Sequence, residues 1–433
     1  MITASRILFT RILAAIVLQV LIVQTLSATT IEWQASSAKF VTSGVYARVK
    51  KLSTGVLALV YSSGSAVYVR RSSDIGATWG SAIRVAQAVG YSYTNAELIE
   101  LENGWLVYGW NGRPTDTGAY FIASIISRDM GLTWADERRI YTAGRIFGEG
   151  CWEPAFLQLP DGSLQVYFAN EKPYVDPNSD QEIGMIQSAD NGLTWGNYTK
   201  VSYRAGSRDG MPVPVLLQGD STIAVAIEDN GLSGYFKPAI VTTPVSDNWT
   251  SGFVSGTSNR RSAALTGSAA LPASVYAGAP YLVRLPSGET ALSVQSTEGR
   301  TLGDPAHIYS IMRVYVGDRQ AKNFGNNSIP FTGIPANGSG LWNSLNVIND
   351  STIMAVSSIS GLSQNGIWTA IGKIRYSVST VRQSGLGQKP ARLTADRAIR
   401  RLPRSVYLIK GLRGGAVMDI AGRKQAEQPA IKR

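Results

Sequence analysis

The chain has 433 residues, is 44% hydrophobic and carries a formal net charge of +11. A single cysteine, Cys151, excludes an internal disulfide, and a single histidine, His307, argues against a Ser-His-Asp triad or a zinc site built from several His or Cys. Residues 382–433 hold 13 basic and 3 acidic side chains, which is +10 of the total charge. The basic balance therefore belongs to the tail, and we expect no nucleic-acid partner, no cofactor and no metal.

Residues 1–27 have the pattern of a secretory signal peptide. Arg6 and Arg11 form a basic start, an apolar stretch follows over Ile12–Leu26, and the small residues Ser27 and Ala28 offer a cleavage site. The apolar stretch is shorter than the ~20 residues that span a bilayer, so an uncleaved anchor is the weaker alternative. We expect an extracellular protein that has no membrane contact after cleavage.

Five Asn-X-Ser/Thr sequons support secretion through a route that glycosylates proteins. They begin at Asn197, Asn248, Asn326, Asn337 and Asn349.

A hairpin pattern, in which two apolar strands flank a short turn, recurs six times along the chain. The turns are centred on Gly55, Gly104, Gly162, Ser221, Gly288 and Ser351. The intervals leave room for two further strands per unit, and four strands repeated six times predict an all-β, six-bladed β-propeller over residues 28–380. Strands near Thr30–Gln34 and Ile367–Tyr376 should close the ring. A β-sandwich or a pair of jelly rolls is the alternative.

A second repeat, S-x-D-x-G-x-T-W, occurs at residues 72–79, 127–134 and 188–195, with an eroded copy at 246–249. These segments resemble the Asp-boxes of sialidase-type propellers. The carboxylate can accept backbone N–H bonds in a turn, the glycine permits the bend, and the tryptophan packs between blades. The repeat therefore marks the fold and not an active site.

The ends of the hairpins opposite the turns should converge on one face, around the propeller axis. Glu153 precedes the third hairpin in the apolar segment Cys151–Phe156, where a carboxyl is costly without a task. Glu228 ends the second strand of the fourth hairpin. A glycosidase needs one carboxyl to protonate the leaving oxygen and another to attack or to activate water. The alternative is that these acids are solvated loop residues.

Further residues at the same ends are predicted to bind substrate. Tyr46 and Trp342 occupy positions equivalent to Glu153 in the first and last hairpins, and aromatic rings stack on sugars. The full set of predicted substrate-binding residues is Glu171, Asp209, Asn95, Tyr46 and Trp342.

Four segments together resemble the fungal exo-1,5-α-L-arabinanases, which are glycoside hydrolases in the sialidase clan. They are Trp152–Pro154, Tyr167–Glu171, Arg208–Pro212 and Ala226–Asp229. The resemblance covers about residues 30–381. It implies a retaining propeller enzyme that trims linear arabinan from an end, releases arabinobiose and uses Glu153 and Glu228 as its catalytic pair. The expected partner is thus a polysaccharide or oligosaccharide, bound by a monomer.

The surroundings of the two glutamates suggest how their roles divide. Glu153 lies between Trp152 and Pro154, and desolvation there should raise its pKa and suit it to act as the general acid/base. Glu228 is followed by the polar residues Asp229 and Asn230, which favours an ionised nucleophile.

Two other functions remain open. A sialidase clamps a carboxylate with three arginines and opens with a Phe/Tyr-Arg-Ile-Pro motif, whereas residues 45–49 here read Val-Tyr-Ala-Arg-Val. Arg48 and Arg284 are the candidate arginines for such a clamp, which makes the set incomplete. A non-catalytic glycan-binding propeller is the second alternative.

Residues 381–402, rich in basic residues, Gly and Pro, are predicted to be a linker. Residues 403–433 resemble the opening of a ricin-type β-trefoil repeat, but a trefoil needs three units of ~40 residues. A disordered tail is the alternative for this segment.

Overall fold

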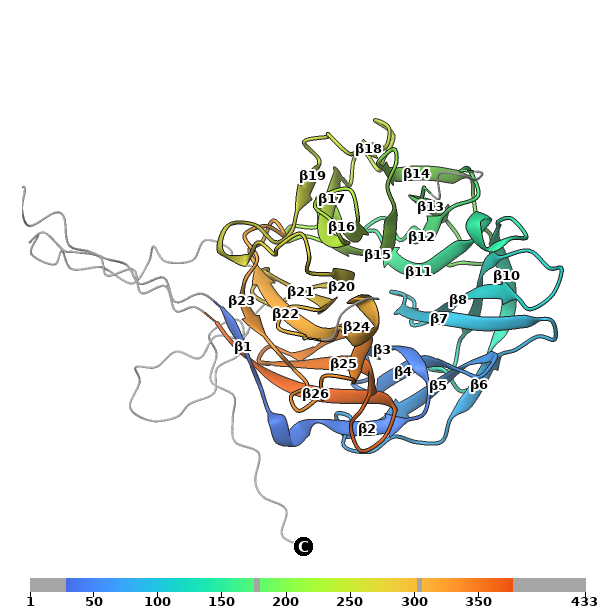
Figure 1. Cartoon of the computed structure of the whole chain (residues 1–433). Helices are drawn as coiled ribbons and strands as arrows, with labels where there is room; N and C mark the ends of the chain where they lie inside the picture. The colour runs from blue at the N-terminus through green and yellow to red at the C-terminus, as the bar shows by residue number, and fades with distance from the viewer. Residues whose placement is uncertain (1–28, 175–179, 302–305, 377–433) are drawn as a thin grey trace, which may run out of the picture. The chain divides into compact units, whose positions relative to one another are not determined.

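The structure is a computed structural model that describes residues 29–174, 180–301 and 306–376. Within these ranges the strands form six sheets that surround a common axis (Figure 1). From the axis outward, blade one consists of β3 (Val45–Lys51), β4 (Leu57–Ser63), β5 (Ala66–Ser72) and β6 (Ile83–Ala86). Blade two consists of β7 (Tyr91–Glu100), β8 (Leu106–Pro114), β9 (Phe121–Ser127) and β10 (Ala135–Thr142). Blade three consists of β11 (Cys151–Gln158), β12 (Leu164–Asn170), β13 (Glu182–Ser188), β14 (Tyr198–Tyr203) and β18 (Val254–Ser255).

Blades four to six follow the same order. Blade four consists of β15 (Asp209–Leu216), β16 (Thr222–Asp229), β17 (Lys237–Pro244) and β19 (Arg261–Ala263). Blade five consists of β20 (Ala277–Arg284), β21 (Thr290–Ser296), β22 (Ile311–Gly317) and β23 (Gly325–Ser328). Blade six consists of β24 (Ser339–Asn349), β25 (Thr352–Ser360), β26 (Gly366–Arg375) and β1 (Thr30–Trp33). The six predicted hairpins are the two innermost strands of each blade, so the predicted six-bladed propeller is confirmed.

The ring is closed by the N-terminal strand. β1 pairs antiparallel with β26 in the register Ile31↔Ile374, and β2 (Lys39–Thr42) pairs with the other end of β26. The last blade therefore takes strands from both ends of the described chain, as the sequence predicted, and the chain continues from β2 on this blade into β3 of the first blade.

The core lies between the blades because each sheet is covered on both faces. On β16 the five consecutive residues Ile223–Ile227 are all buried. A strand that is apolar on both faces reads as a continuous hydrophobic run, and the small residues Ala224 and Ala226 let neighbouring blades approach. The rigid stack of blades fixes where each inner strand presents its ends.

The three S-x-D-x-G-x-T-W segments fold into the same turn after the third strand of blades one, two and three. In the second copy, Thr133 N–H donates to Asp129 Oδ1 at 2.8 Å and Gly131 N–H donates to Ser127 Oγ at 2.8 Å. Gly131 has a φ of 83°, a conformation that favours glycine. The turns lie at the end of the blade opposite the start of the inner strand, which supports their structural role.

Some predictions fall outside the described residues. These are the signal peptide at 1–27, the linker at 381–402 and the lectin-like segment at 403–433. Within the described ranges, no helix has the length and apolar character needed to cross a bilayer.

Candidate active site

A ring of six strained residues surrounds the axis at one end of the propeller. Each inner strand has a register shift near its start, and the residue inside this bulge has a left-handed backbone. The six residues and their φ angles are Tyr46 (54°), Asn95 (56°), Glu153 (53°), Met211 (50°), Ala279 (46°) and Trp342 (49°). Positive φ is uncommon outside glycine, and bulges redirect side chains next to functional sites. The repetition in all six blades places Glu153 in the axial ring.

The bulges also explain the position of Glu228. At three blade boundaries the N–H of the bulge residue donates to a side chain on the second strand of the preceding blade. Tyr46 N–H donates to Ser358 Oγ at 3.0 Å, Trp342 N–H to Gln295 Oε1 at 2.8 Å, and Ala279 N–H to Glu228 Oε2 at 2.7 Å. Glu228 therefore faces the axis from blade four and is held by the backbone of blade five.

The Glu153 side chain is largely buried but keeps some exposure to solvent. Burial raises the pKa of Glu153 from 4.5 to about 7, and repulsion from Glu228 adds to the shift, while Arg113 and Arg208 oppose it. A carboxyl with this pKa is protonated in a substantial fraction of molecules near neutral pH. Glu153 belongs to the ring and Glu228 is bonded to the ring residue Ala279, so both carboxyls lie at the axial opening.

The Glu228 side chain lies against two glycines. A Cβ on Gly210 would lie 3.0 Å from Glu228 Oε1, and a Cβ on Gly278 would lie 2.5 Å from Glu228 Oε2 and 2.3 Å from the hydroxyl oxygen of Tyr276. Burial raises the pKa of Glu228, while the bond from Ala279 N–H and the charge of Arg208 oppose that shift. The close packing fixes the carboxylate, and it places Tyr276 beside it.

Glu171 lies behind the catalytic candidates and supports them. Its carboxylate is 1% exposed; Oε1 forms an ion pair with Arg208 and accepts from Gln181 Nε2 at 3.1 Å, whereas Oε2 has no hydrogen-bond partner among the described residues. Arg208 lowers the pKa of both Glu153 and Glu228. Glu171 thus anchors a guanidinium that acts on both carboxyls.

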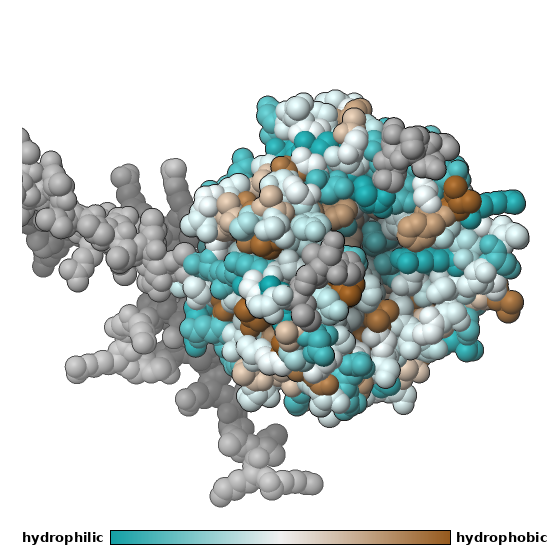
Figure 2. Space-filling view, in the orientation of Figure 1, coloured by the Kyte–Doolittle hydropathy of each residue, from teal (hydrophilic) through white to brown (hydrophobic). Residues whose placement is uncertain are grey.

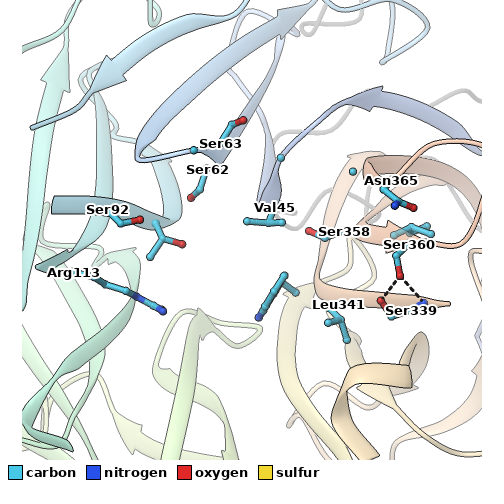
Figure 3. A pocket seen from close by; sticks show the side chains of 16 residues that line it. Val45, Ser62, Ser63, Ser92, Arg113, Ser339, Leu341, Ser358, Ser360 and Asn365 are labelled. Carbon is cyan, nitrogen blue, oxygen red and sulfur yellow. Dashed lines mark hydrogen bonds between the residues drawn. The ribbon is translucent and has the colours of Figure 1, made fainter. Parts of the chain in front are cut away.

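A cleft of about 540 Å³ opens beside the axial ring, between blades one, two and six (Figure 3). Arg113 and Trp342 both line it, and Arg113 also stacks on the Trp152 ring, with 4.7 Å between its guanidinium carbon and the ring centroid. Asn95 Oδ1 accepts from Arg113 Nη2 at 2.8 Å. Figure 2 shows this end of the molecule hollowed near its centre, with hydrophilic and hydrophobic residues around the hollow.

The axial opening has a floor of paired charges. Arg48 stacks beneath Tyr46 at 4.1 Å and its guanidinium lies 3.5 Å from Glu97, while Lys50 lies 3.1 Å from Glu97 and donates to the Tyr281 hydroxyl at 2.8 Å. Tyr46 is 4% exposed. Its ring therefore seals the floor more than it offers a stacking surface, whereas Trp342 is partly exposed at the cleft.

Asp209 does not face the opening, contrary to its predicted role in substrate binding. It is fully buried: Oδ1 accepts from Arg261 Nη1 at 2.8 Å, Oδ2 accepts from Ser202 Oγ at 2.8 Å, and the Arg261 guanidinium also pairs with Asp229. The ring position of this blade belongs to Met211, two residues further on. Asp209 holds blade four together and leaves no oxygen for a sugar.

The two arginines considered for a sialidase clamp lie elsewhere. Arg48 is 3% exposed and donates to the carbonyl oxygens of Ala47, Trp342 and Asn343. Arg284 ends β20, at the opposite end of the blade from the ring, and pairs with Asp220. Neither guanidinium reaches the axial carboxyls.

Sequence reasoning missed two of the site residues. Tyr276 precedes β20 and Arg113 lies near the end of β8, and neither stands in a periodic pattern that marks it. Arg208 was part of the 208–212 segment but had no role assigned to it. Within the described residues, no group of three or more His, Cys, Asp or Glu side chains could hold a metal ion.

The fold defines the class of the protein, a six-bladed β-propeller. The chain belongs to the BNR repeat-like domain family, whose model matches residues 44–262. A search of curated proteins finds no match.

Solved structures share the fold at low sequence identity. An α-L-arabinofuranosidase of family GH93 from Fusarium graminearum, in complex with arabinobiose, has a TM-score of 0.57 and 16% identity over 78% of this chain and 94% of its own. An α-L-arabinanase from Penicillium chrysogenum, also in complex with arabinobiose, has a TM-score of 0.54 and 19% identity over 80% of this chain and 97% of its own. The NanB sialidase of Streptococcus pneumoniae has a TM-score of 0.52 and 11% identity over 80% of this chain and 70% of its own.

Proposed function

We propose that this protein is a secreted, retaining glycoside hydrolase that acts from the end of linear α-1,5-L-arabinan and releases arabinobiose. The observation that carries the proposal is the meeting of Glu153 and Glu228 in one axial opening, where burial and the charge of Glu228 raise the pKa of Glu153 to about 7. Hydrolysis of a glycosidic bond needs one protonated and one ionised carboxyl. The two propellers that hold arabinobiose favour arabinan as the substrate.

In this mechanism the Glu153 carboxyl donates its proton to the leaving oxygen, and the Glu228 carboxylate attacks the anomeric carbon to form a glycosyl ester. Glu153, now ionised, takes a proton from water, which attacks the anomeric carbon and breaks its bond to the Glu228 oxygen, so the sugar leaves with its configuration retained. Arg208 favours the ionised form of both glutamates and so supports Glu228 before attack and Glu153 after it.

The proposal is tested by product analysis with three substrates: linear arabinan, debranched arabinan and a sialyl glycoside. We expect arabinobiose as the first product from linear arabinan, with the α configuration seen by NMR before mutarotation. Release of sialic acid would favour the sialidase alternative. Retention on immobilised arabinan without any product would favour a binding propeller.

Gly278 gives a prediction about how tightly the site is built. In Gly278→Ala, the new Cβ would overlap Glu228 Oε2 and the Tyr276 hydroxyl, so both side chains must move. A displacement of about 1 Å at a catalytic group can cost about 10²-fold, and we expect kcat/KM on arabino-oligosaccharides to fall by about 10- to 100-fold.

The matched control for this variant is Gly325→Ala on β23, where a Cβ meets no atom within 4 Å. It should keep both kcat/KM and Tm. Normal turnover in Gly278→Ala with an unchanged fold would place the reacting groups away from Glu228.

A further inference from the structure

The cleft between blades one, two and six is lined by apolar and polar side chains, none of them a carboxylate (Figure 3). Hydroxyls, one guanidinium and one amide provide the polar part, and the Trp342 ring with the aliphatic Val45, Leu341 and Ile359 provides the apolar part. The polar members are Ser62, Ser63, Ser92, Thr94, Arg113, Ser339, Ser358, Ser360 and Asn365. A volume of about 540 Å³ falls within the ~300–1,000 Å³ of ligand pockets. The cleft therefore has both the size and the chemistry of a sugar subsite.

Arg113 is the charged group in this lining, and its charge is not balanced by an ion pair. Its Nε donates to Asn111 Oδ1 at 2.9 Å and its Nη2 to Asn95 Oδ1 at 2.8 Å, both neutral amides. No ion pair involves Arg113 in the part of the chain that the structure describes. Burial lowers the pKa of Arg113, and Glu153 opposes that shift. When Glu153 is protonated to act as the acid, this guanidinium loses the negative charge that most opposes the shift.

The geometry leaves the free side of Arg113 turned toward the cleft. The guanidinium extends from β8 into the open space in Figure 3. Its Nε and one Nη donate to the two amides, and it stacks on the Trp152 ring. A half-buried cation is costly without an anion, and the planar fork of arginine matches a carboxylate. The arrangement fits an anionic ligand better than a neutral one.

Ser62 provides an independent sign of a ligand. It is 2% exposed, lines the cleft, and its hydroxyl has no hydrogen-bond partner among the described residues. Ser62 pairs with Val45 on β3 just as Glu228 pairs with Gly210 on β15, yet no bulge N–H donates to it. Buried polar groups without a partner are rare, and a sugar oxygen in the cleft would supply one.

We propose that this cleft is a subsite for a carboxylate-bearing sugar unit, bound by Arg113 and Ser62 beside the axial glutamates. The inference rests on the proposed function in that it takes the ligand to be a glycan. It goes beyond that function, because linear arabinan carries no carboxylate and the unit bound here would belong to a glycan in which a uronic acid lies next to the sugar that is cut. A single guanidinium from blade two makes this contact, not a set of three arginines.

The test measures equilibrium binding of methyl glucuronide and methyl galacturonide to the full chain by titration calorimetry, with the methyl esters of the same sugars as uncharged controls. We expect at least one acid to bind about tenfold more tightly than its ester, since a charge-assisted bond to Arg113 is lost in the ester. Arg113→Met should remove this preference, and the exposed Arg375→Met, far from the cleft, should keep it.

Ser62→Ala gives a second arm. Removing an unpartnered hydroxyl should not lower Tm, yet it should weaken binding of the acid by about threefold or more. Equal binding of acid and ester, or binding that is unaffected by Arg113→Met and Ser62→Ala, would overturn the proposal. Uronate binding without hydrolysis of any glycan would support this subsite and refute the proposed function. Hydrolysis of arabinan without uronate binding would support the proposed function and refute this subsite.

Discussion

Replacing Glu228 by alanine should abolish turnover of arabino-oligosaccharides, and sodium azide should restore it. The Glu228 carboxylate lies in the axial opening, where it accepts a hydrogen bond from Ala279 N–H. Its removal should keep the fold and open a space where the carboxylate would have met the anomeric carbon. We expect kcat to fall by about 10³-fold or more, as for other covalent nucleophiles. Azide entering that space attacks from the same side and gives a glycosyl azide of inverted configuration, which NMR identifies.

Glu228→Gln separates this chemical role from a structural one. The amide oxygen of glutamine can still accept the bond from Ala279 N–H, as Gln295 accepts the bond from Trp342 N–H at the next blade boundary. If Glu228 only held the bulge, the Gln variant would keep its turnover. We expect near-native stability together with a loss of turnover as large as in Glu228→Ala. A Gln variant with wild-type rates would place the nucleophile elsewhere.

The fold could be predicted because its signals repeat. The six hairpin turns fix the two inner strands of every blade, and strands at both ends of the propeller were free to pair and close the ring. Aligning the hairpins also placed Tyr46, Glu153 and Trp342 at equivalent positions, and the structure shows all three inside the bulges.

The error at Asp209 has a physical cause in that alignment. Asp209 opens β15 as Cys151 opens β11, so the counterpart of Glu153 is Met211 and not Asp209. A bulge shifts which side chains face the axis. Proline follows the bulge residue in three blades, at Pro154, Pro212 and Pro280, and aligning these prolines would have placed Met211 opposite Glu153. Arg113 and Tyr276 were missed because they are held in the site by contacts with residues distant in the sequence, Asn95 and Gln295.

The pH dependence should report the unusual environment of Glu153. With its pKa raised to about 7, kcat/KM should fall as pH rises through that value, because the acid loses its proton. Glu153→Gln should lose this basic limb together with most activity on substrates that have poor leaving groups. In Glu228→Gln the repulsive charge is gone, so the pKa of Glu153 should fall; NMR titration of a Glu-labelled sample measures it. A pKa of Glu153 that is the same in both proteins would show that the two carboxyls do not share the opening.

The same shift makes a prediction about stability. The folded protein holds the Glu153 proton more tightly than the unfolded chain, whose pKa is near 4.5. The contribution of Glu153 to the free energy of unfolding is therefore fully present below about pH 4.5 and is lost as pH rises through about 7. Glu153→Gln does not titrate, so its stability relative to wild type should rise over this window by roughly 1–3 kcal/mol. Urea unfolding of both proteins at pH 5 and pH 8 measures the difference. If the gap between them is the same at the two pH values, Glu153 is not a desolvated acid. A gap that widens at pH 8, in a variant that has lost its activity, would show that the protein gives up stability to keep a protonated carboxyl at its axis.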